Sequence, residues 1–221
     1  MSAYCCSDLH GNKIIYDKII DYVGDNKLFI LGDLCDRGPD GYAMIKDALS
    51  RSNITYIKGN HEELFVNAAQ DIIQSSEYWT TAVGWHTDNG GAPTLIKWIE
   101  DGKPTDILNQ LKNLPEYIEY KNDKYNILLC HSGSKKDWLW DRSHFYKNEE
   151  LPEGLIIIYG HTPVNYMTAM ANLPYANGKI YWHNNHQKLN IDLETANSNK
   201  AALINLDTLK PIYFTEKGID K

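Results

Sequence analysis

Residues 27–38 read KLFILGDLCDRG, an apolar run of strand type that leads into a loop of glycine, acidic and basic residues. Two other segments repeat this arrangement: the apolar run at 3–6 leads into SDLHG at 7–11, and the run at 54–58 leads into GNHE at 59–62. Two helical patterns separate these segments. One follows Asn12, with apolar residues at helical spacing, and the other covers 39–49 and starts with Pro39. Strands that alternate with helices predict a mainly parallel sheet covered by helices.

The rest of the sequence predicts a second, strand-rich half. Residues 63–115 have helical patterns that are interrupted at 88–91, and a hairpin pattern follows over 117–130. Further strands are expected at 155–159, 179–182, 188–192, 201–206 and 211–214. We find no repeat, linker or domain boundary. The chain is therefore predicted to form one α/β domain over residues 1–221, with two packed sheets and a helical insertion at about 64–115.

The composition is that of an ordinary globular protein. Among the 221 residues, 43% are apolar and 23% are charged, which excludes a disordered chain. The formal net charge of −7 argues against wrapping a long nucleic acid, because such proteins usually carry a basic excess. We see no signal-peptide pattern, no apolar run that could span a bilayer and no CxxC pair among the four cysteines. A cytoplasmic protein with buried, reduced thiols is therefore expected.

Polar residues of metal-binding or phosphate-binding type follow five of the predicted strands. These residues are Asp8 and His10, Asp33 and Asp36, Asn60 and His61, His131, and His161. Taken singly, each has a simpler interpretation, since an acidic residue before glycine often forms a turn and a single histidine is more often structural. The carboxyl ends of parallel strands, however, are where open α/β sheets place their sites. Five such clusters together predict one shared functional site.

These segments resemble the calcineurin-like metallophosphoesterases, and more narrowly the phosphoprotein-phosphatase branch in its small bacterial and phage form, the lambda phosphatase type. The family pattern stands here as SDLHG, GDLCDRG, GNHE, CHSG and YGHTP, with Ser7 in place of the family's first glycine. Pro163 replaces the second histidine of the wider superfamily's Gly-His-x-His, which favours the phosphatase branch. The resemblance runs from residue 7 to about 206 and is weakest over 64–125. Near its end, residues 194–199 replace the usual glycine-rich turn.

The resemblance implies a four-layer αββα fold, in which a two-sheet β-sandwich flanked by helices holds two divalent metal ions. Six residues are carried over as ligands: Asp8 and His10 for the first ion, Asp33 as a bridge to both, and Asn60, His131 and His161 for the second. Carboxylate, amide and imidazole ligands together suit Mn²⁺, which we expect first, and also Fe, Zn, Co or Ni. Two such ions make hydroxide available near neutral pH, and the expected nucleophile is a hydroxide that bridges them.

Hydrolysis of a phosphate ester also needs a proton for the leaving oxygen. His61 is the candidate general acid, because a histidine exchanges protons near neutral pH. Asp36 is expected to hold the His61 ring and to raise its basicity.

Two arginines are expected to bind the phosphoryl oxygens, since forked donors match phosphate geometry. Arg37 is the first. The second is Arg142, because the segment WLWDR at 138–142 resembles the family's Trp-x-Arg segment. The alternative for Arg142 is a surface salt bridge with Asp141 or Glu149.

Several other polar and aromatic residues are predicted to lie outside the chemistry. His144 is expected at the surface, and three further histidines are expected in structural or solvent-facing positions: His86, His183 and His186. Glu62 and Glu63 are expected to cap the helix that follows the site. Three tryptophans are predicted to pack in the core of the helical insertion: Trp79, Trp85 and Trp98. Alternatively, residues 88–91 and nearby aromatics form a wall of the substrate groove.

The resemblance predicts a metal-dependent phosphatase that acts on phosphoserine, phosphothreonine or phosphotyrosine in proteins. Dinucleoside polyphosphates such as diadenosine tetraphosphate are the alternative, because related enzymes cleave them with the same metal centre. A non-catalytic metal-binding module is a different class, which the intact ligand positions disfavour; the acidic charge disfavours a nuclease. The expected partners are phosphorylated proteins or small phosphate esters, without extended nucleic-acid or membrane binding. A monomer in a bacterial or phage-infected cytoplasm fits these expectations.

Overall fold

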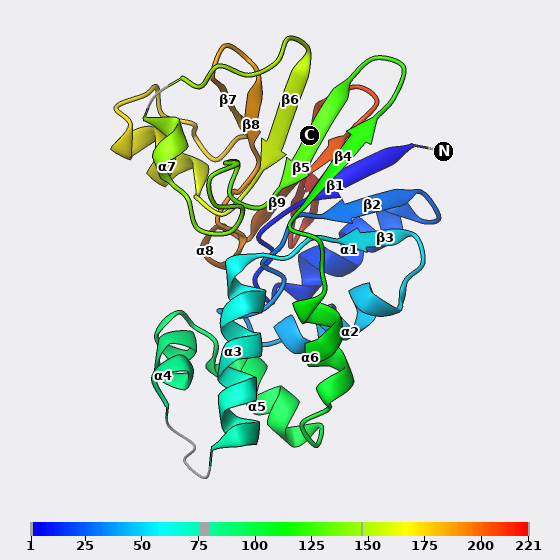
Figure 1. Cartoon of the computed structure of the whole chain (residues 1–221). Coiled ribbons are helices and arrows are strands. Elements are labelled where there is room, and N and C mark those ends of the chain that lie inside the picture. Colours follow the sequence, from blue (N-terminus) through cyan, green and yellow to red (C-terminus); the bar gives the residue numbers. More distant parts are fainter. Residues whose placement is uncertain (1, 76–79, 147, 221) are drawn as a thin grey trace.

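Two mixed sheets lie face to face in the centre of the molecule, with helices outside them (Figure 1). The computed structural model describes residues 2–75, 80–146 and 148–220, so Trp79 lies outside the described residues. One sheet has the strand order β11-β10-β9-β1-β2-β3, and the other has the order β4-β5-β6-β8-β7. The predicted α/β class with two sheets and flanking helices is therefore confirmed.

The six-stranded sheet is built from β1 Ala3–Cys6, β2 Lys27–Ile30, β3 Ile54–Tyr56, β9 Lys200–Asn205, β10 Lys210–Thr215 and β11 Gly218–Asp220. The five-stranded sheet is built from β4 Tyr117–Lys121, β5 Asn126–Cys130, β6 Leu155–Tyr159, β7 Tyr181–His183 and β8 Lys188–Asn190. Each strand predicted from the sequence is present. The short β11 was not predicted, because three residues carry no alternation and its strand form depends on pairing with β10.

Alternation along the strands divides the interior into two cores. Cys5 and Phe29 point toward the five-stranded sheet and pack with Leu129 and other residues of its inner face. Their neighbours Cys6 and Ile30 belong to the core between the first sheet and the helices. All four cysteines are buried and unpaired, as predicted. Opposite orientations of successive residues therefore let a short apolar strand serve both cores.

Helices α1 (Lys13–Val23) and α2 (Gly41–Ser50) pack on the outer side of β1–β3. Asn12 caps α1, since its Oδ1 accepts the N–H of Ile15 at 3.1 Å. The predicted start of the second helix at Pro39 was wrong, because Asp40 is the N-cap and Pro39 precedes it. The chain before α2 is tied to the first loop instead: the N–H of Gly38 donates to the carbonyl of His10 at 3.1 Å.

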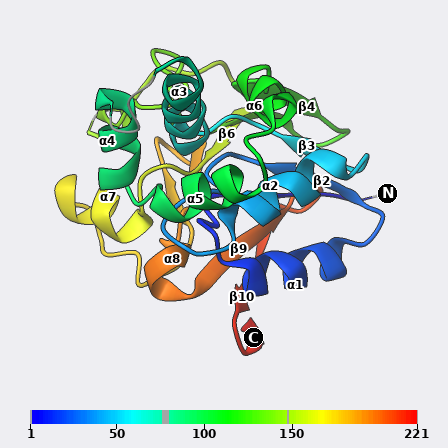
Figure 2. The same ribbon diagram turned by 90° about the horizontal axis from the view of Figure 1, so that it is seen from below.

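Four helices form the insertion at one end of the sheets: α3 Asn60–Gln74, α4 Thr81–Asp88, α5 Ala92–Glu100 and α6 Thr105–Lys112 (Figures 1 and 2). Trp98 is fully buried there and meets Phe65 edge to face, as predicted. The prediction for Trp85 was wrong, because its side chain is 59% exposed. The short α4 buries only Val83 and His86, which leaves Trp85 on its outer face.

The closing segment holds the two short helices α7 (Val164–Met170) and α8 (Thr195–Ser198). Glu194 and Asn199 flank α8 with φ of 59° and 51°, the left-handed region that glycine usually occupies. The short helix thus takes the place of the family's glycine-rich turn. No helix within the described ranges is long and apolar enough to cross a membrane.

Candidate metal centre

Backbone hydrogen bonds join the loops that follow β1 and β2, and close packing brings the loop after β3 against them. The N–H of His10 donates to the carbonyl of Asp33 at 3.0 Å, and the N–H of Gly11 donates to Leu34 at 2.8 Å. Gly32 is packed so closely against Gly59 that an added Cβ would lie 2.6 Å from its Cα. Glycine at this position therefore allows neighbouring loops to bring their polar side chains together.

Several site residues have an unusual backbone conformation. Their φ angles lie between 41° and 68°, in the left-handed region: Asp8, His10, Asp33, Asp36, Arg37 and His161. A side chain in this region normally raises the free energy of the folded chain, so such residues gather where the surrounding structure imposes the conformation. Their grouping at these loops indicates that side-chain direction, rather than packing stability, determines the backbone there.

Asn60, His131 and His161 bring three donor atoms together. The Oδ1 of Asn60 lies 2.9 Å from Nε2 of His131 and 2.8 Å from Nδ1 of His161. The other ring nitrogen of His131 donates to the carbonyl of Leu31 at 2.7 Å. This outward hydrogen bond orients Nε2 toward the centre, as second-sphere carbonyls do for metal-binding histidines.

Asp8, His10 and Asp33 form the adjoining group. Nε2 of His10 lies 3.9 Å from an oxygen of Asp8 and 3.6 Å from Oδ2 of Asp33, while its Nδ1 donates to the carbonyl of Cys35 at 2.9 Å. Ser7 donates its hydroxyl to Asp8, so the residue that replaces the family's glycine supports a candidate ligand. Asp33 faces both groups, because its Oδ1 lies 3.4 Å from Nε2 of His131.

The charge balance of the two groups fits divalent cations. Asp8 and Asp33 are both 1% exposed, and burial raises the pKa of Asp8 to about 6. Burial would lower the pKa of His131, but the carboxylates of Asp33 and Asp8 raise it to about 10. The cluster thus stabilises positive charge in a buried place. The donors suit borderline cations, and two clusters within 4.8 Å share Asp33: His10–Asp33–His61 and Asp33–His131–His161.

Both ring nitrogens of His61 face charged side chains. Its Nδ1 lies 2.8 Å from Oδ2 of Asp36, and its Nε2 lies 3.3 Å from a guanidinium nitrogen of Arg37. A fixed positive charge beside Nε2 disfavours a cation there, which argues against His61 as a ligand although it lies near Asp33. Burial lowers the pKa of His61, but Asp33 and Asp36 together raise it above its usual value.

Arg142 lies beside His161, one of the candidate ligands. Its Nε is 3.0 Å from Nε2 of His161, so the guanidinium reaches the site. Glu149, one of the expected alternative partners, pairs instead with the buried Lys188 at 2.7 Å. Both candidate phosphate-binding arginines, Arg37 and Arg142, therefore lie beside site histidines and have exposed side chains.

Glu62 has a larger role than the expected helix cap. It is fully buried, and its carboxylate accepts the N–H groups of Gly59, Asp33 and Leu34 at 2.8–3.0 Å, together with the hydroxyl of Tyr56. It thereby joins the second and third loops. Its place in the GNHE motif was the available signal for this role. Glu63 remains at the helix start and accepts Nε1–H of Trp140 at 2.9 Å.

The remaining histidines lie outside the two metal-type groups. His186 is exposed and His183 is half-buried, with its Nε2 2.6 Å from the hydroxyl of Tyr159. The prediction of a surface position for His144 was wrong, because this residue is 2% exposed. Its ring packs against Tyr159 and Phe145, a contact that the local sequence did not indicate.

We expect the buried His144 to make the protein sensitive to acid. Burial lowers its pKa to about 3, so the unfolded chain takes up a proton below about pH 6.5 while the folded chain does not. Stability is therefore lost as the pH falls from 6.5 toward 3. This residue should account for about 2 kcal/mol of unfolding free energy between pH 7.5 and 5.

Urea titrations of the wild type and His144→Phe at these two pH values measure this contribution. Phenylalanine keeps a ring against Tyr159 but cannot take up a proton. The variant should show a correspondingly smaller loss on acidification. An unchanged pH dependence would mean that His144 is protonated in the folded state.

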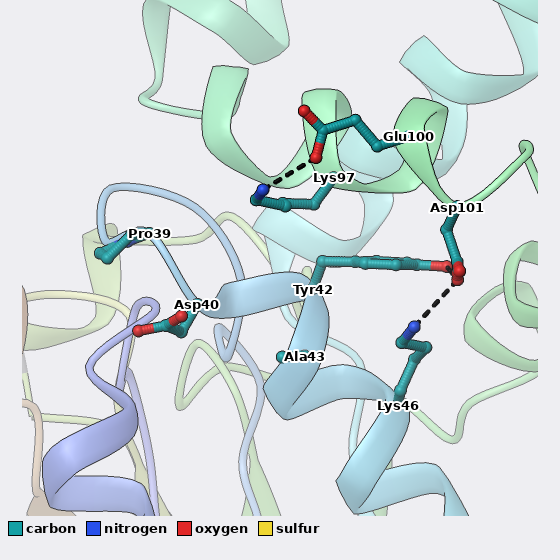
Figure 3. Close-up of a pocket in the computed structure, with 8 residues that line it drawn as sticks. All are labelled: Pro39, Asp40, Tyr42, Ala43, Lys46, Lys97, Glu100 and Asp101. Carbon is teal, nitrogen blue, oxygen red and sulfur yellow. Dashed lines mark hydrogen bonds and ion pairs between the residues drawn. The ribbon is translucent and has the colours of Figure 1, made fainter.

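A separate depression of about 310 Å³ lies between α2 and α5, lined by residues outside the metal-type groups (Figure 3). Both lysines that line it form ion pairs: Lys46 with Asp101 at 2.9 Å and Lys97 with Glu100 at 2.8 Å. The paired charges on this face give no reason to place phosphate there.

The sequence over residues 1–196 matches the family model of the calcineurin-like phosphoesterases. The chain belongs to this family. The metallophosphoesterase resemblance inferred from the five loops is thereby confirmed. Phosphoesterases of this family use divalent metals, and Asp33 belongs to both clusters of side chains that could hold a metal ion.

The chain is also similar to several curated proteins and solved structures. An asymmetrical bis(5'-nucleosyl)-tetraphosphatase, PrpE of Anoxybacillus flavithermus, is 24% identical over 71% of this chain and 77% of its own length. A symmetrical bis(5'-nucleosyl)-tetraphosphatase of Nitrosomonas europaea is 24% identical over 85% of this chain, which spans 62% of that protein. The structure of a metallophosphoesterase from Sphaerobacter thermophilus superimposes with a TM-score of 0.60, at 14% identity over 100% of this chain and 88% of its own. Protein phosphatases also share this fold.

Proposed function

We propose that the protein is a two-metal phosphoester hydrolase. The observation that carries the proposal is the placement of Asp33 between two buried groups of donors, with Asp8 and His10 on one side and His131 on the other. Asn60 and His161 complete the second side. Two divalent ions held by these residues, with Mn²⁺ the first candidate, would supply an activated water and neutralise phosphoryl oxygens.

The residues around the metal groups are assigned two further roles, phosphate binding and proton transfer. Arg37 and Arg142 offer guanidinium groups to the phosphoryl oxygens that face solvent, where charge builds up during hydrolysis. His61 presents Nε2 beside Arg37, and we assign it the transfer of a proton to the leaving oxygen. Asp36 keeps the proton of the other nitrogen, Nδ1, in place and so fixes the ring.

For the substrate class, we propose dinucleoside polyphosphates ahead of phosphoproteins, which reverses the order expected from the sequence. Two kinds of support favour this order. The curated relatives above are named as dinucleoside tetraphosphatases. In addition, Trp140 lies at the rim of the centre, 37% exposed, with its ring 6.3 Å from that of His161. Its Nε1–H bond to Glu63 fixes the ring, and an exposed, fixed indole suits stacking on a nucleobase.

A substrate panel tests this order. The Mn²⁺-loaded protein should hydrolyse diadenosine tetraphosphate with a kcat/KM at least tenfold above that for phosphoserine, phosphothreonine and phosphotyrosine peptides. Trp140→Ala should raise KM for the dinucleotide by about fivefold or more, since base stacking contributes about 1–3 kcal/mol, and should leave a phosphoserine peptide unaffected. Trp140→Phe keeps a stacking ring and is the matched control.

Two results would reverse the proposal. A tenfold preference for the phosphopeptides would restore the phosphoprotein assignment. No hydrolysis of any substrate, including p-nitrophenyl phosphate, would favour a metal-binding module that lacks catalysis.

A further inference from the structure

The carboxylate of Asp36 has two histidine partners, and only one of them belongs to the loops that follow the strands. Its Oδ2 accepts Nδ1–H of His61 at 2.8 Å, and its Oδ1 lies 2.9 Å from Nε2 of His86. His86 comes from α4 in the helical insertion, fifty residues further along the chain. The three side chains form a continuous buried row, because Asp36 and His86 are fully buried and His61 is 2% exposed.

The proton on the His86 ring has one consistent position. Nδ1 of His86 is buried and finds no hydrogen-bond partner in the described part of the chain. An ionised carboxylate only accepts hydrogen bonds, so the proton sits on Nε2 and points at Asp36. Burial would raise the pKa of Asp36, but the hydrogen bonds from His61 and His86 lower it to about 2. Both carboxylate oxygens are therefore held, and the group cannot rotate away from His61.

Packing holds the His86 ring in this place. Gly91 lies directly against it, since an added Cβ would come within 2.2 Å of the ring, and the ring of Phe65 lies 5.7 Å away. The same insertion also holds the backbone of the catalytic loop. Thr94 accepts the N–H of Asp36 at 2.9 Å, and the carbonyl of Gly90 accepts the N–H of Arg37 at 2.8 Å.

These contacts explain how two successive residues of the loop keep a left-handed backbone. Asp36 and Arg37 have φ of 68° and 61°, a conformation that needs support from the surroundings. The insertion supplies that support with two hydrogen bonds to the backbone of the loop, from Oγ1 of Thr94 and the carbonyl of Gly90, and one hydrogen bond to the side chain of Asp36. Of these three contacts, only the one from His86 reaches the carboxylate that orients His61.

We propose that His86 is a positioning residue for the general acid: it fixes Asp36 from the far side, so that His61 presents Nε2 to the leaving oxygen. This inference rests on the proposed function of His61. The row His86–Asp36–His61 has one proton between each pair of side chains, on Nε2 of His86 and on Nδ1 of His61. Loss of the N–H donor of His86 leaves Oδ1 of Asp36 buried without a partner and allows the carboxylate to rotate.

The kinetic test compares two leaving groups. His86→Phe keeps an aromatic ring between Phe65 and Gly91 but removes the donor, while His86→Gln retains an N–H donor at similar reach. We expect His86→Phe to lower kcat about tenfold with phenyl phosphate, less than threefold with p-nitrophenyl phosphate, and to leave KM and bound metal unchanged. His86→Gln should recover most of the loss. Equal losses with both substrates, or none with either, would overturn the proposal.

A second measurement does not depend on turnover. In ¹⁵N-histidine-labelled, Zn²⁺-loaded protein, NMR should show the ring of His61 as a single Nδ1–H tautomer. His86→Phe should give mixed tautomers or fast exchange of that proton, and His86→Gln should restore the single form. An unchanged spectrum in His86→Phe would show that His86 does not fix the ring. A wild type inert toward all phosphate esters would refute the proposed function instead, while this spectrum still decides whether His86 holds His61.

Discussion

The His61→Asn variant is expected to bind its metals normally but to lose about 10²–10⁴ in kcat with substrates that have poor leaving groups. The side-chain amide of asparagine can still donate to Asp36 from near the position of Nδ1, so the loop should stay folded. What is lost is Nε2, the nitrogen that lies beside Arg37 and to which we assign delivery of the proton. Steady-state kinetics with phenyl phosphate and with p-nitrophenyl phosphate measure the effect.

The assignment of His61 as the general acid depends on the difference between the losses of kcat for the two substrates. p-Nitrophenolate is stable without a proton, and its hydrolysis should therefore fall much less than that of phenyl phosphate. His186→Asn is the matched control, because His186 is exposed and already has a left-handed φ of 62° that asparagine accepts. Losses of the same size for both leaving groups in His61→Asn would mean that His61 has a role other than proton donation.

The Asp33→Asn variant should lose metal as well as activity. Oδ1 of Asp33 faces His131 and Oδ2 faces His10, so this carboxylate reaches both sides of the centre. An amide replaces one oxygen by a nitrogen with no free lone pair and removes the negative charge. We expect bound metal to fall from two ions per chain to one or fewer, and kcat/KM to fall by more than about 10²-fold. This loss is larger than that expected from removing a residue that only hydrogen-bonds to a metal ligand.

Elemental analysis after dialysis against a fixed free concentration of Mn²⁺ measures the metal content. Asp101→Asn is a suitable control, because it makes the same chemical change at an exposed ion pair with Lys46, outside the metal-type groups. Circular dichroism should show both variants folded. Two ions per chain in Asp33→Asn would remove the bridging role that we assign to this residue.

The strands and the loops of the centre could be predicted because their signals are local. An apolar run of four or five residues that ends in glycine and a polar cluster identifies both the strand and the point where it stops, as at Leu31–Asp33. The hydrogen bond from Asn12 that begins α1 is equally local. Where the local signal was weak, the prediction failed: α2 begins after Pro39, and β11 exists only through its pairing with β10.

Burial on the short helices was less predictable, because it depends on what packs against each face. Trp85 and His86 are neighbours in sequence, yet one is exposed and the other fully buried. His144 resembles a surface residue in sequence but lies under Tyr159. Composition and spacing contain no information about which distant element covers such a residue.

By itself, the sequence determined the order of the strands along the chain, the family and the identity of the candidate ligands, because each is encoded within a few consecutive residues. The tertiary structure decided which oxygen of Asp33 faces which histidine, and it showed that His86 holds Asp36 from a helix fifty residues away. The physical reason is that these contacts join segments that are far apart in the sequence. Hydrogen bonds between distant segments form only after the sheets and the insertion have packed, and no local pattern records them.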